Sequence, residues 1–172
     1  MNWKPKAKHF YEQRLHLLAL LLLDTGARIT EALSLRVSDV DLDNMLLVLN
    51  GKGRKQRIVP FSFALRKALH HFIADFLRPD SLLFATQVGV QVRRMTALRS
   101  IKRLCQQLGF DPPARTLHSF RHCFAANYVR RGGSVFHLQK MLGHSSLEMS
   151  RRYASLTTMD LQTAHERLSL LR

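Results

Sequence analysis

The chain has 172 residues, 46% of them hydrophobic, which is enough for one well-buried core and fits one domain better than two. Its 27 Lys and Arg against 12 Asp and Glu give a formal net charge of +15, which favours nucleic acid as the partner. Composition alone leaves open a merely soluble basic protein or one that binds anionic lipid. The longest apolar run, residues 17–23, is far shorter than the roughly 20 residues that cross a bilayer, and no signal peptide precedes it, so we expect no membrane association and a cytoplasmic location.

The first elements predicted along the chain are two helices. Leucines fall on nearly every face of residues 13–24, which predicts a short helix buried all round. Gly26 breaks this helix, and a helical pattern resumes over residues 30–35, so Arg28 is expected at a helix start. Residues 37–42, rich in Asp and β-branched side chains, are predicted to form the loop that leaves the second helix.

A β-hairpin and a third helix follow. Residues 46–49 and 57–61 are short apolar stretches separated by Asn50-Gly51-Lys52-Gly53, and the Asn-Gly pair is a strong hairpin signal. The pattern predicts a hairpin with a cationic tip. Ser62 is a suitable N-cap for a helix that runs to about residue 77 and stops before Pro79.

The second half of the chain is predicted to be helical. Apolar residues recur every three or four positions over 92–108, and Gly109 ends that pattern. Further helices are expected over 117–131, closed by Gly132-Gly133, and over 135–142, closed by Gly143.

The last predicted helices carry the third tyrosine of the sequence. Ser145 and Glu148 form a capping box, so a helix should begin at Ser146 and hold Tyr153 near its far end. An amphipathic helix over 159–171 closes the chain. The expected fold class is mainly α with a small antiparallel β-hairpin, in one domain without internal repeats.

Several residues have alternative chemical readings when taken singly. His118 and His122 stand four positions apart, as zinc ligands do, but the intervening Ser-Phe-Arg lacks a glutamate and adds a cation, so no metal is expected. Residues 51–53 could be a phosphate loop, yet the Gly-x4-Gly-Lys-Ser/Thr pattern is absent. Cys105 and Cys123 lie in amphipathic segments without Cys-x-x-Cys spacing, which indicates buried thiols.

Four segments spread over nearly the whole chain carry motifs in a fixed order. They are Thr25-Gly26-Ala27-Arg28-Ile29-Thr30-Glu31-Ala32-Leu33, Gly51-Lys52-Gly53-Arg54-Lys55-Gln56-Arg57-Ile58-Val59-Pro60, Leu117-His118-Ser119-Phe120-Arg121-His122, and Leu142-Gly143-His144-Ser145-Ser146 with Tyr153 beyond. Arg28 precedes Lys52 by 24 positions, and His144 precedes Tyr153 by 9. Together the segments resemble the boxes of the tyrosine recombinase, or phage integrase, family.

This resemblance implies a tyrosine recombinase catalytic-domain fold over residues 1–172. It also implies site-specific recombination by DNA strand cleavage and rejoining through a 3′-phosphotyrosine intermediate, without a metal or nucleotide cofactor. The active-site residues that it implies, with Tyr153 as the nucleophile, are Arg28, Lys52, His118, Arg121, His144 and Tyr153.

The chemistry of phosphoryl transfer suits these residue types. Charge builds up on the non-bridging oxygens, and the always-charged guanidinium groups of Arg28 and Arg121 can each bind two of them. Tyrosine has an unperturbed pKa of about 10 and must lose its proton during attack, for which His118 is the family's candidate base. His144 is expected to donate a hydrogen bond to the phosphate, and Lys52 to protonate the departing 5′-oxygen.

The remaining expectations concern support and binding. Glu31 is expected to orient Arg28, although an exposed helix carboxylate is an alternative, and His122 to be a buried support residue. Double-stranded DNA is the expected partner, together with further protomers in a tetrameric synapse in which the helix over 159–171 is exchanged in trans or folds back on its own domain. The residues expected to bind DNA are Arg54, Lys55, Arg57, Arg94, Arg99, Lys102 and Arg103.

Other readings of the same boxes remain. Recombinases of this kind usually carry a helical core-binding domain before the first box, and this sequence shows none, so we expect either a fragment or a minimal integrase that depends on partners. The expected location is the bacterial cytoplasm, in association with the nucleoid. A type IB topoisomerase would use the same chemistry to relax supercoils. A non-catalytic DNA-binding module would be expected to lack at least one of the six residues, and all six are present.

Overall fold

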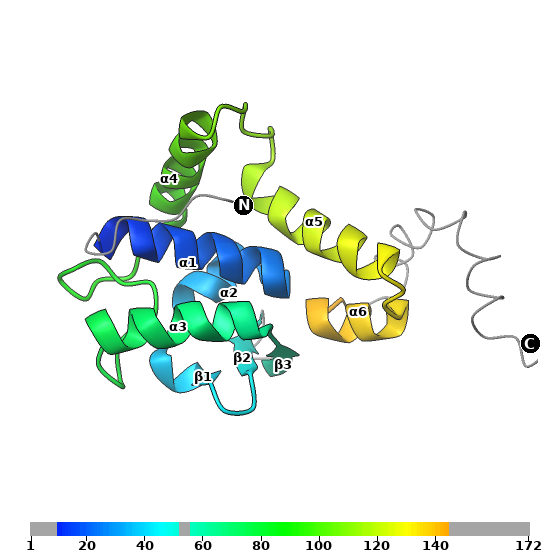
Figure 1. Cartoon of the computed structure of the whole chain (residues 1–172), viewed down its shortest axis with the longest axis horizontal. Helices are drawn as coiled ribbons and strands as arrows, with labels where there is room; N and C mark the ends of the chain where they lie inside the picture. Colours follow the sequence, from blue (N-terminus) through cyan, green and yellow to red (C-terminus); the bar gives the residue numbers. More distant parts are fainter. Residues whose placement is uncertain (1–9, 52–55, 145–172) are drawn as a thin grey trace, which may run out of the picture.

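The computed structural model describes residues 10–51 and 56–144. These residues form six helices and a small sheet, as the sequence predicts (Figure 1). In chain order the elements are α1 (Phe10–Thr25), α2 (Ile29–Ser34), the 3₁₀ turn η1 (Val37–Asp39), β1 (Val40–Asp41), β2 (Leu46–Asn50), β3 (Gln56–Pro60), α3 (Phe63–Phe76), α4 (Arg94–Gln107), α5 (Thr116–Arg130) and α6 (Val135–Leu142).

The predicted hairpin is confirmed as β2 and β3, but the sheet has a third strand. The strand order is β1-β2-β3, and both pairs are antiparallel. Residues 37–42, predicted to be a loop, instead contain η1 and the two-residue strand β1. A strand of two residues is too short to show an alternating pattern, so periodicity could not reveal it. Leu49 pairs with Arg57, and Leu47 with Val59, on the face that meets the core.

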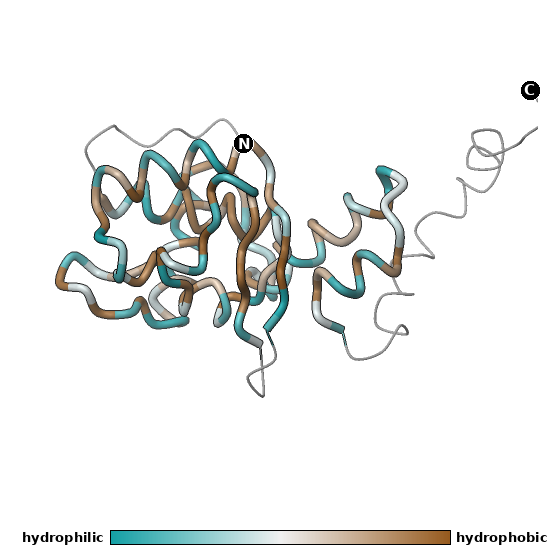
Figure 2. The backbone as a smooth tube through the Cα atoms, turned by 90° about the horizontal axis from the view of Figure 1, so that it is seen from below, coloured by the Kyte–Doolittle hydropathy of each residue, from teal (hydrophilic) through white to brown (hydrophobic). Residues whose placement is uncertain are grey.

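Helix α1 lies at the centre of the main core, as its leucines predict. Leu17, Leu21 and Leu22 are almost completely buried, and α1 contacts α2, α3, α4 and α5. Hydrophobic segments gather in the interior of the part of the molecule that contains this main core (Figure 2). Within the described residues, no helix combines the length and apolar character that crossing a membrane requires.

The predicted helix ends are present where capping chemistry places them. The Ser62 hydroxyl accepts a hydrogen bond from the Leu65 amide at 3.3 Å, so Ser62 caps α3. Gly143 ends α6 in the left-handed conformation with φ 63°, which a residue without a Cβ adopts at little cost. The bounds of α6 agree with those expected from the sequence.

Helices α5 and α6 form a second, smaller apolar cluster beside the main core (Figure 1). Its fully or nearly fully buried members are Ala125, Val129, Leu138 and Leu142. The buried positions of α5 recur every four residues and include Arg121. The junction between the two clusters is therefore where a buried cation lies.

This geometry corrects two predictions on α5. His122 and Cys123 were expected to be buried, and both are exposed. Helix α5 has apolar residues on several faces, and the stripe that it buries contains Arg121 in place of Cys123. Cys105, on α4, is buried as predicted.

We predict that Gly26→Ala strongly destabilises the fold. Gly26 has φ 61°, and a Cβ there would lie 2.4 Å from Phe124 Cδ1 on α5 and 2.9 Å from Leu142 Cδ2 on α6. Gly109→Ala is the matched control, because Gly109 has φ 80° with nothing within 4 Å of the added Cβ. Both changes carry the left-handed penalty of about 1–2 kcal/mol, and only Gly26→Ala adds overpacking of about 1–3 kcal/mol. Equal free energies of urea unfolding for the two variants would contradict this reading.

Candidate active site

Arg28 lies at the start of α2, as the sequence predicts. It is the N-cap residue, with extended backbone angles of φ −69° and ψ 144°. Its backbone N–H donates to Glu31 Oε2 at 2.7 Å, and its Nη1 donates to Glu31 Oε1 at 3.0 Å. The Arg28 side chain remains 42% exposed. Glu31 thus binds both the backbone and the side chain of Arg28. The guanidinium of Arg28 nevertheless stays accessible to a ligand.

Glu31 is a buried carboxylate, so the alternative of an exposed helix carboxylate is wrong. It is 4% exposed and also accepts two hydrogen bonds at 2.7 Å from Nη1 and Nη2 of Arg57. Burial raises the pKa of Glu31, but the hydrogen bonds and charge of Arg57 and the bonds from Arg28 outweigh it and lower the pKa overall. The carboxylate is therefore ionised at neutral pH.

Arg121 connects the turn after α1 with the end of α6. Its Nη1 donates to the Gly26 carbonyl at 2.9 Å, and its Nη2 donates to the Leu142 carbonyl. The side chain is only 9% exposed. Gly26 belongs to the motif of Arg28, and Leu142 belongs to the motif of His144. Arg121 therefore brings three of the four motifs together through main-chain contacts.

His144 follows the left-handed Gly143. Together with Arg28, Glu31, Arg57 and Arg121 it forms the described part of the candidate site, called the site cluster below. Its backbone N–H donates to the Gln139 carbonyl at 3.1 Å. Burial, followed by the charges of Arg121, Arg28 and Arg57, lowers the pKa of His144 to about 4. The imidazole is therefore neutral at pH 7. It lies in the field of three guanidinium groups, an environment that attracts an anion.

Arg57 has a position that its sequence context did not predict. It was expected on a DNA-binding surface, but its side chain is 12% exposed and bonds Glu31 and the Met141 carbonyl. The pairing of β3 with β2 puts Arg57 on the same face as the buried Val59. Strand alternation was thus the signal that could have identified Arg57 as an internal residue.

Comparison with known proteins identifies the family of this chain. The sequence profile of the phage integrase family matches residues 6–159, which is most of the chain. The chain belongs to the phage integrase family. Tyrosine recombinase XerD of Corynebacterium glutamicum is 35% identical over 148 residues, which are 83% of this chain and 48% of that protein.

Solved structures of integrase-family proteins share the fold. The crystal structure of XerA recombinase superimposes with a TM-score of 0.77 at 30% identity, covering 91% of this chain and 58% of that one. XerH site-specific recombinase bound to difH substrate gives 0.75 at 27% identity, covering 95% and 48%. This chain spans about half the length of the curated relatives that it matches.

Two of the six expected integrase residues, Lys52 and Tyr153, lie outside the described residues. So do Arg54, Lys55, the capping box at 145–148 and the amphipathic segment 159–171. Of the other four, Arg28, Arg121 and His144 meet at the site cluster. His118 is exposed on the first turn of α5, where its backbone N–H donates to the Arg115 carbonyl at 2.8 Å.

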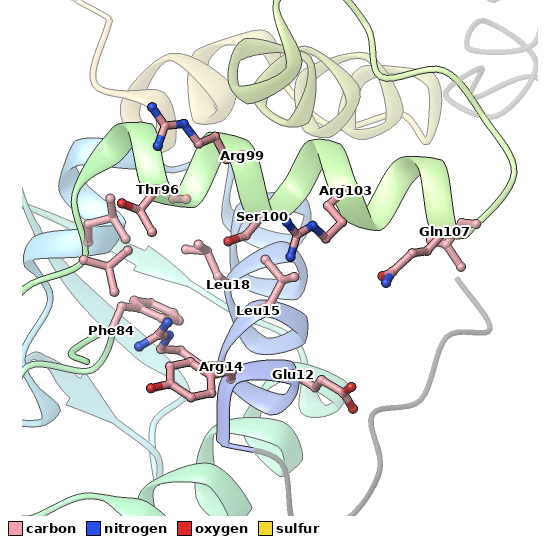
Figure 3. Close-up of a pocket in the computed structure, with 15 residues that line it drawn as sticks. Glu12, Arg14, Leu15, Leu18, Phe84, Thr96, Arg99, Ser100, Arg103 and Gln107 are labelled. Carbon is pink, nitrogen blue, oxygen red and sulfur yellow. The ribbon is translucent and has the colours of Figure 1, made fainter. Parts of the chain in front are cut away.

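The basic residues expected on α4 are exposed. Arg99 and Arg103 line a cavity of about 650 Å³ between α4 and α1, whose walls include Leu15 and Leu18 (Figure 3). Arg94 and Lys102 lie on the same helix and are also exposed. Helix α4 therefore presents four cations to the surroundings and buries Ala97, Ile101, Leu104 and Cys105 of its apolar side.

We predict that His144 makes the fold less stable in mild acid. Because its folded pKa of about 4 lies below the ordinary value of 6.5, the unfolded chain binds the extra proton first. The free energy of unfolding should therefore fall as pH drops from 6.5 towards 4, and His144→Asn should flatten this slope. Urea unfolding at several pH values measures it. His71→Asn, on the exposed surface of α3, is the control, and an unchanged slope in His144→Asn would refute the assignment.

Proposed function

We propose that this chain is a catalytic domain that cleaves and rejoins DNA strands at specific sites through a 3′-phosphotyrosine link, with Tyr153 as the nucleophile. The observation that carries the proposal is the convergence of Arg28, Arg121 and a neutral His144 at one junction. Their charges and donors suit a phosphodiester whose non-bridging oxygens gain charge during displacement.

The roles of the described residues follow from their surroundings. Arg28 has a partly exposed guanidinium that can bind the scissile phosphate directly. Arg121 adds a positive charge that two main-chain carbonyls hold in a fixed position. His144 is neutral, and a neutral imidazole still has one N–H that can donate to a phosphate oxygen. Fixed charges of this kind can lower the barrier without reorganisation during the reaction.

DNA is the proposed substrate and partner. The relative XerH was crystallised bound to its difH substrate, and this chain shares its fold. A net charge of +15 also fits a polyanion. We assign duplex contacts to the exposed cations of α4 and to the basic residues of the β2–β3 connection, which are Arg94, Arg99, Lys102, Arg103, Arg54 and Lys55.

We further propose that the active assembly is a tetrameric synapse on DNA, in which segment 159–171 of one protomer docks on the next. The support is its amphipathic pattern and its place just beyond the nucleophile. Such an assembly would act on bacterial DNA in the cytoplasm, at the nucleoid.

We predict that Tyr153→Phe keeps DNA binding and eliminates a denaturant-resistant protein–DNA adduct. The ring is retained while the attacking oxygen is lost. The assay uses a nicked duplex carrying a site selected from random-sequence DNA, with the adduct resolved on a denaturing gel. Tyr128→Phe is the matched control, because Tyr128 packs against Phe124 on α5. An adduct at the wild-type level in Tyr153→Phe would place the nucleophile elsewhere.

We predict that Lys52 is the general acid for the leaving 5′-oxygen. Lys52→Ala should slow cleavage of ordinary DNA by about 10²-fold to 10⁴-fold. Sulfur at the 5′-bridging position should restore most of that loss, because a thiolate leaves without a proton. The same sulfur should do little for Arg28→Ala, whose defect lies at the non-bridging oxygens. Equal rescue of both variants, measured by single-turnover cleavage, would make Lys52 a phosphate-binding cation.

A further inference from the structure

Arg57 reaches two other elements from its place on β3. Its Nη1 and Nη2 donate to Oε1 and Oε2 of Glu31 on α2, both at 2.7 Å. Its Nε donates to the carbonyl of Met141 on α6 at 2.8 Å. Each guanidinium nitrogen therefore has a protein acceptor. We therefore assign Arg57 a role within the protein and not in direct ligand binding.

Positive charges outnumber negative charges around Glu31, and the excess positive charge determines whether Arg28 can bind an anion. Glu31 carries one negative charge between two guanidinium groups. Arg57 makes the bidentate pair with it, whereas Arg28 makes one side-chain bond, at 3.0 Å, and stays 42% exposed. Bidentate pairs are the stronger kind. Arg57 thus neutralises the carboxylate of Glu31. The second positive charge of the group stays on the partly exposed Arg28.

Removing Arg57 would change this balance. A buried carboxylate that loses its main partner is strongly unfavourable, so the Arg28 guanidinium would be drawn onto it. The pair would then have no net charge towards a ligand. We propose that Arg57 is a positioning residue that neutralises Glu31 and so keeps the charge of Arg28 available to a phosphate. This inference rests on the proposed function and deepens it.

The second attachment of Arg57 extends its effect to His144. The Met141 carbonyl belongs to the last turn of α6, and a Cβ built on Gly143 would lie 3.1 Å from Arg57 Cδ. Arg57 therefore packs against the turn that carries His144. The Arg57 side chain thus keeps the charge of Arg28 available to a ligand and also positions the end of α6.

The first test measures phosphate binding. Inorganic phosphate is titrated into the full chain, and its affinity is obtained from the rise in Tm. Arg57→Met should weaken phosphate binding by about tenfold, the effect of one partly exposed charge. The double variant Arg57→Met/Glu31→Gln, which removes the carboxylate as well, should return to within about threefold of wild type. Arg66→Met is the control, because Arg66 also donates from Nε to a carbonyl, that of Leu42, at 2.7 Å.

Two comparisons separate positioning from simple loss of stability. In a Glu31→Gln background, Arg57→Met should leave phosphate affinity unchanged, and this comparison holds even where the single variant Arg57→Met fails to fold. In an Arg28→Ala background, Arg57→Met should add little further loss, because Arg57 acts through Arg28. Independent losses in either background would overturn the proposal, and so would a double variant as weak as Arg57→Met alone.

Cleavage provides the second readout. In folded protein at saturating DNA, Arg57→Met should slow adduct formation by about 10²-fold, and the double variant should recover most of it. The phosphate titration needs no cleavage. A wild-type chain that forms no adduct would therefore contradict the proposed function, while the order of phosphate affinities would still decide the role of Arg57.

Discussion

The site depends on one buried carboxylate. Glu31 lies on a helix of six residues, α2, and binds the backbone and side chain of Arg28 together with the side chain of Arg57. Isolated buried charges are costly, so a carboxylate here is stable only with its arginines in place. The same requirement orients the arginines. A constraint on burial thereby becomes a constraint on where positive charge faces the ligand.

At the junction of α5 and α6 with the main core, hydrogen bonds from arginines hold the elements together. Apolar packing does this elsewhere in the fold. Arg121 and Arg57 bond the Leu142 and Met141 carbonyls, which belong to the last turn of α6 and have no partner within the helix. The bonds satisfy the helix end and fix its position relative to α2. Polar contacts of this kind are directional, so they determine the relative placement of the motifs more closely than apolar packing would.

Much of the fold follows from local patterns. The helix start at Arg28, the capping of α3 by Ser62 and the bounds of α6 were all predictable because each depends on nearby residues. The motifs also named Arg121 and His144, and the structure places both near Arg28. Long-range pairing was harder to predict: Arg57 was assigned to a DNA-binding surface, and His122 and Cys123 were assigned to the buried face of α5. Strand alternation indicates that Arg57 faces inward, but its pairing with Glu31, 26 positions away in the chain, depends on the tertiary fold.

The two apolar clusters of the described residues hold different parts of the site. Arg28, Glu31 and Arg57 belong to elements of the main core, whereas Arg121 and His144 are held by α5 and by the end of α6. Within residues 10–51 and 56–144 the smaller cluster has four buried apolar members, so its partial unfolding would expose far less surface than global unfolding. The site would then come apart while the larger core stays folded. The geometry of the site is therefore a more sensitive indicator of native docking than secondary structure is.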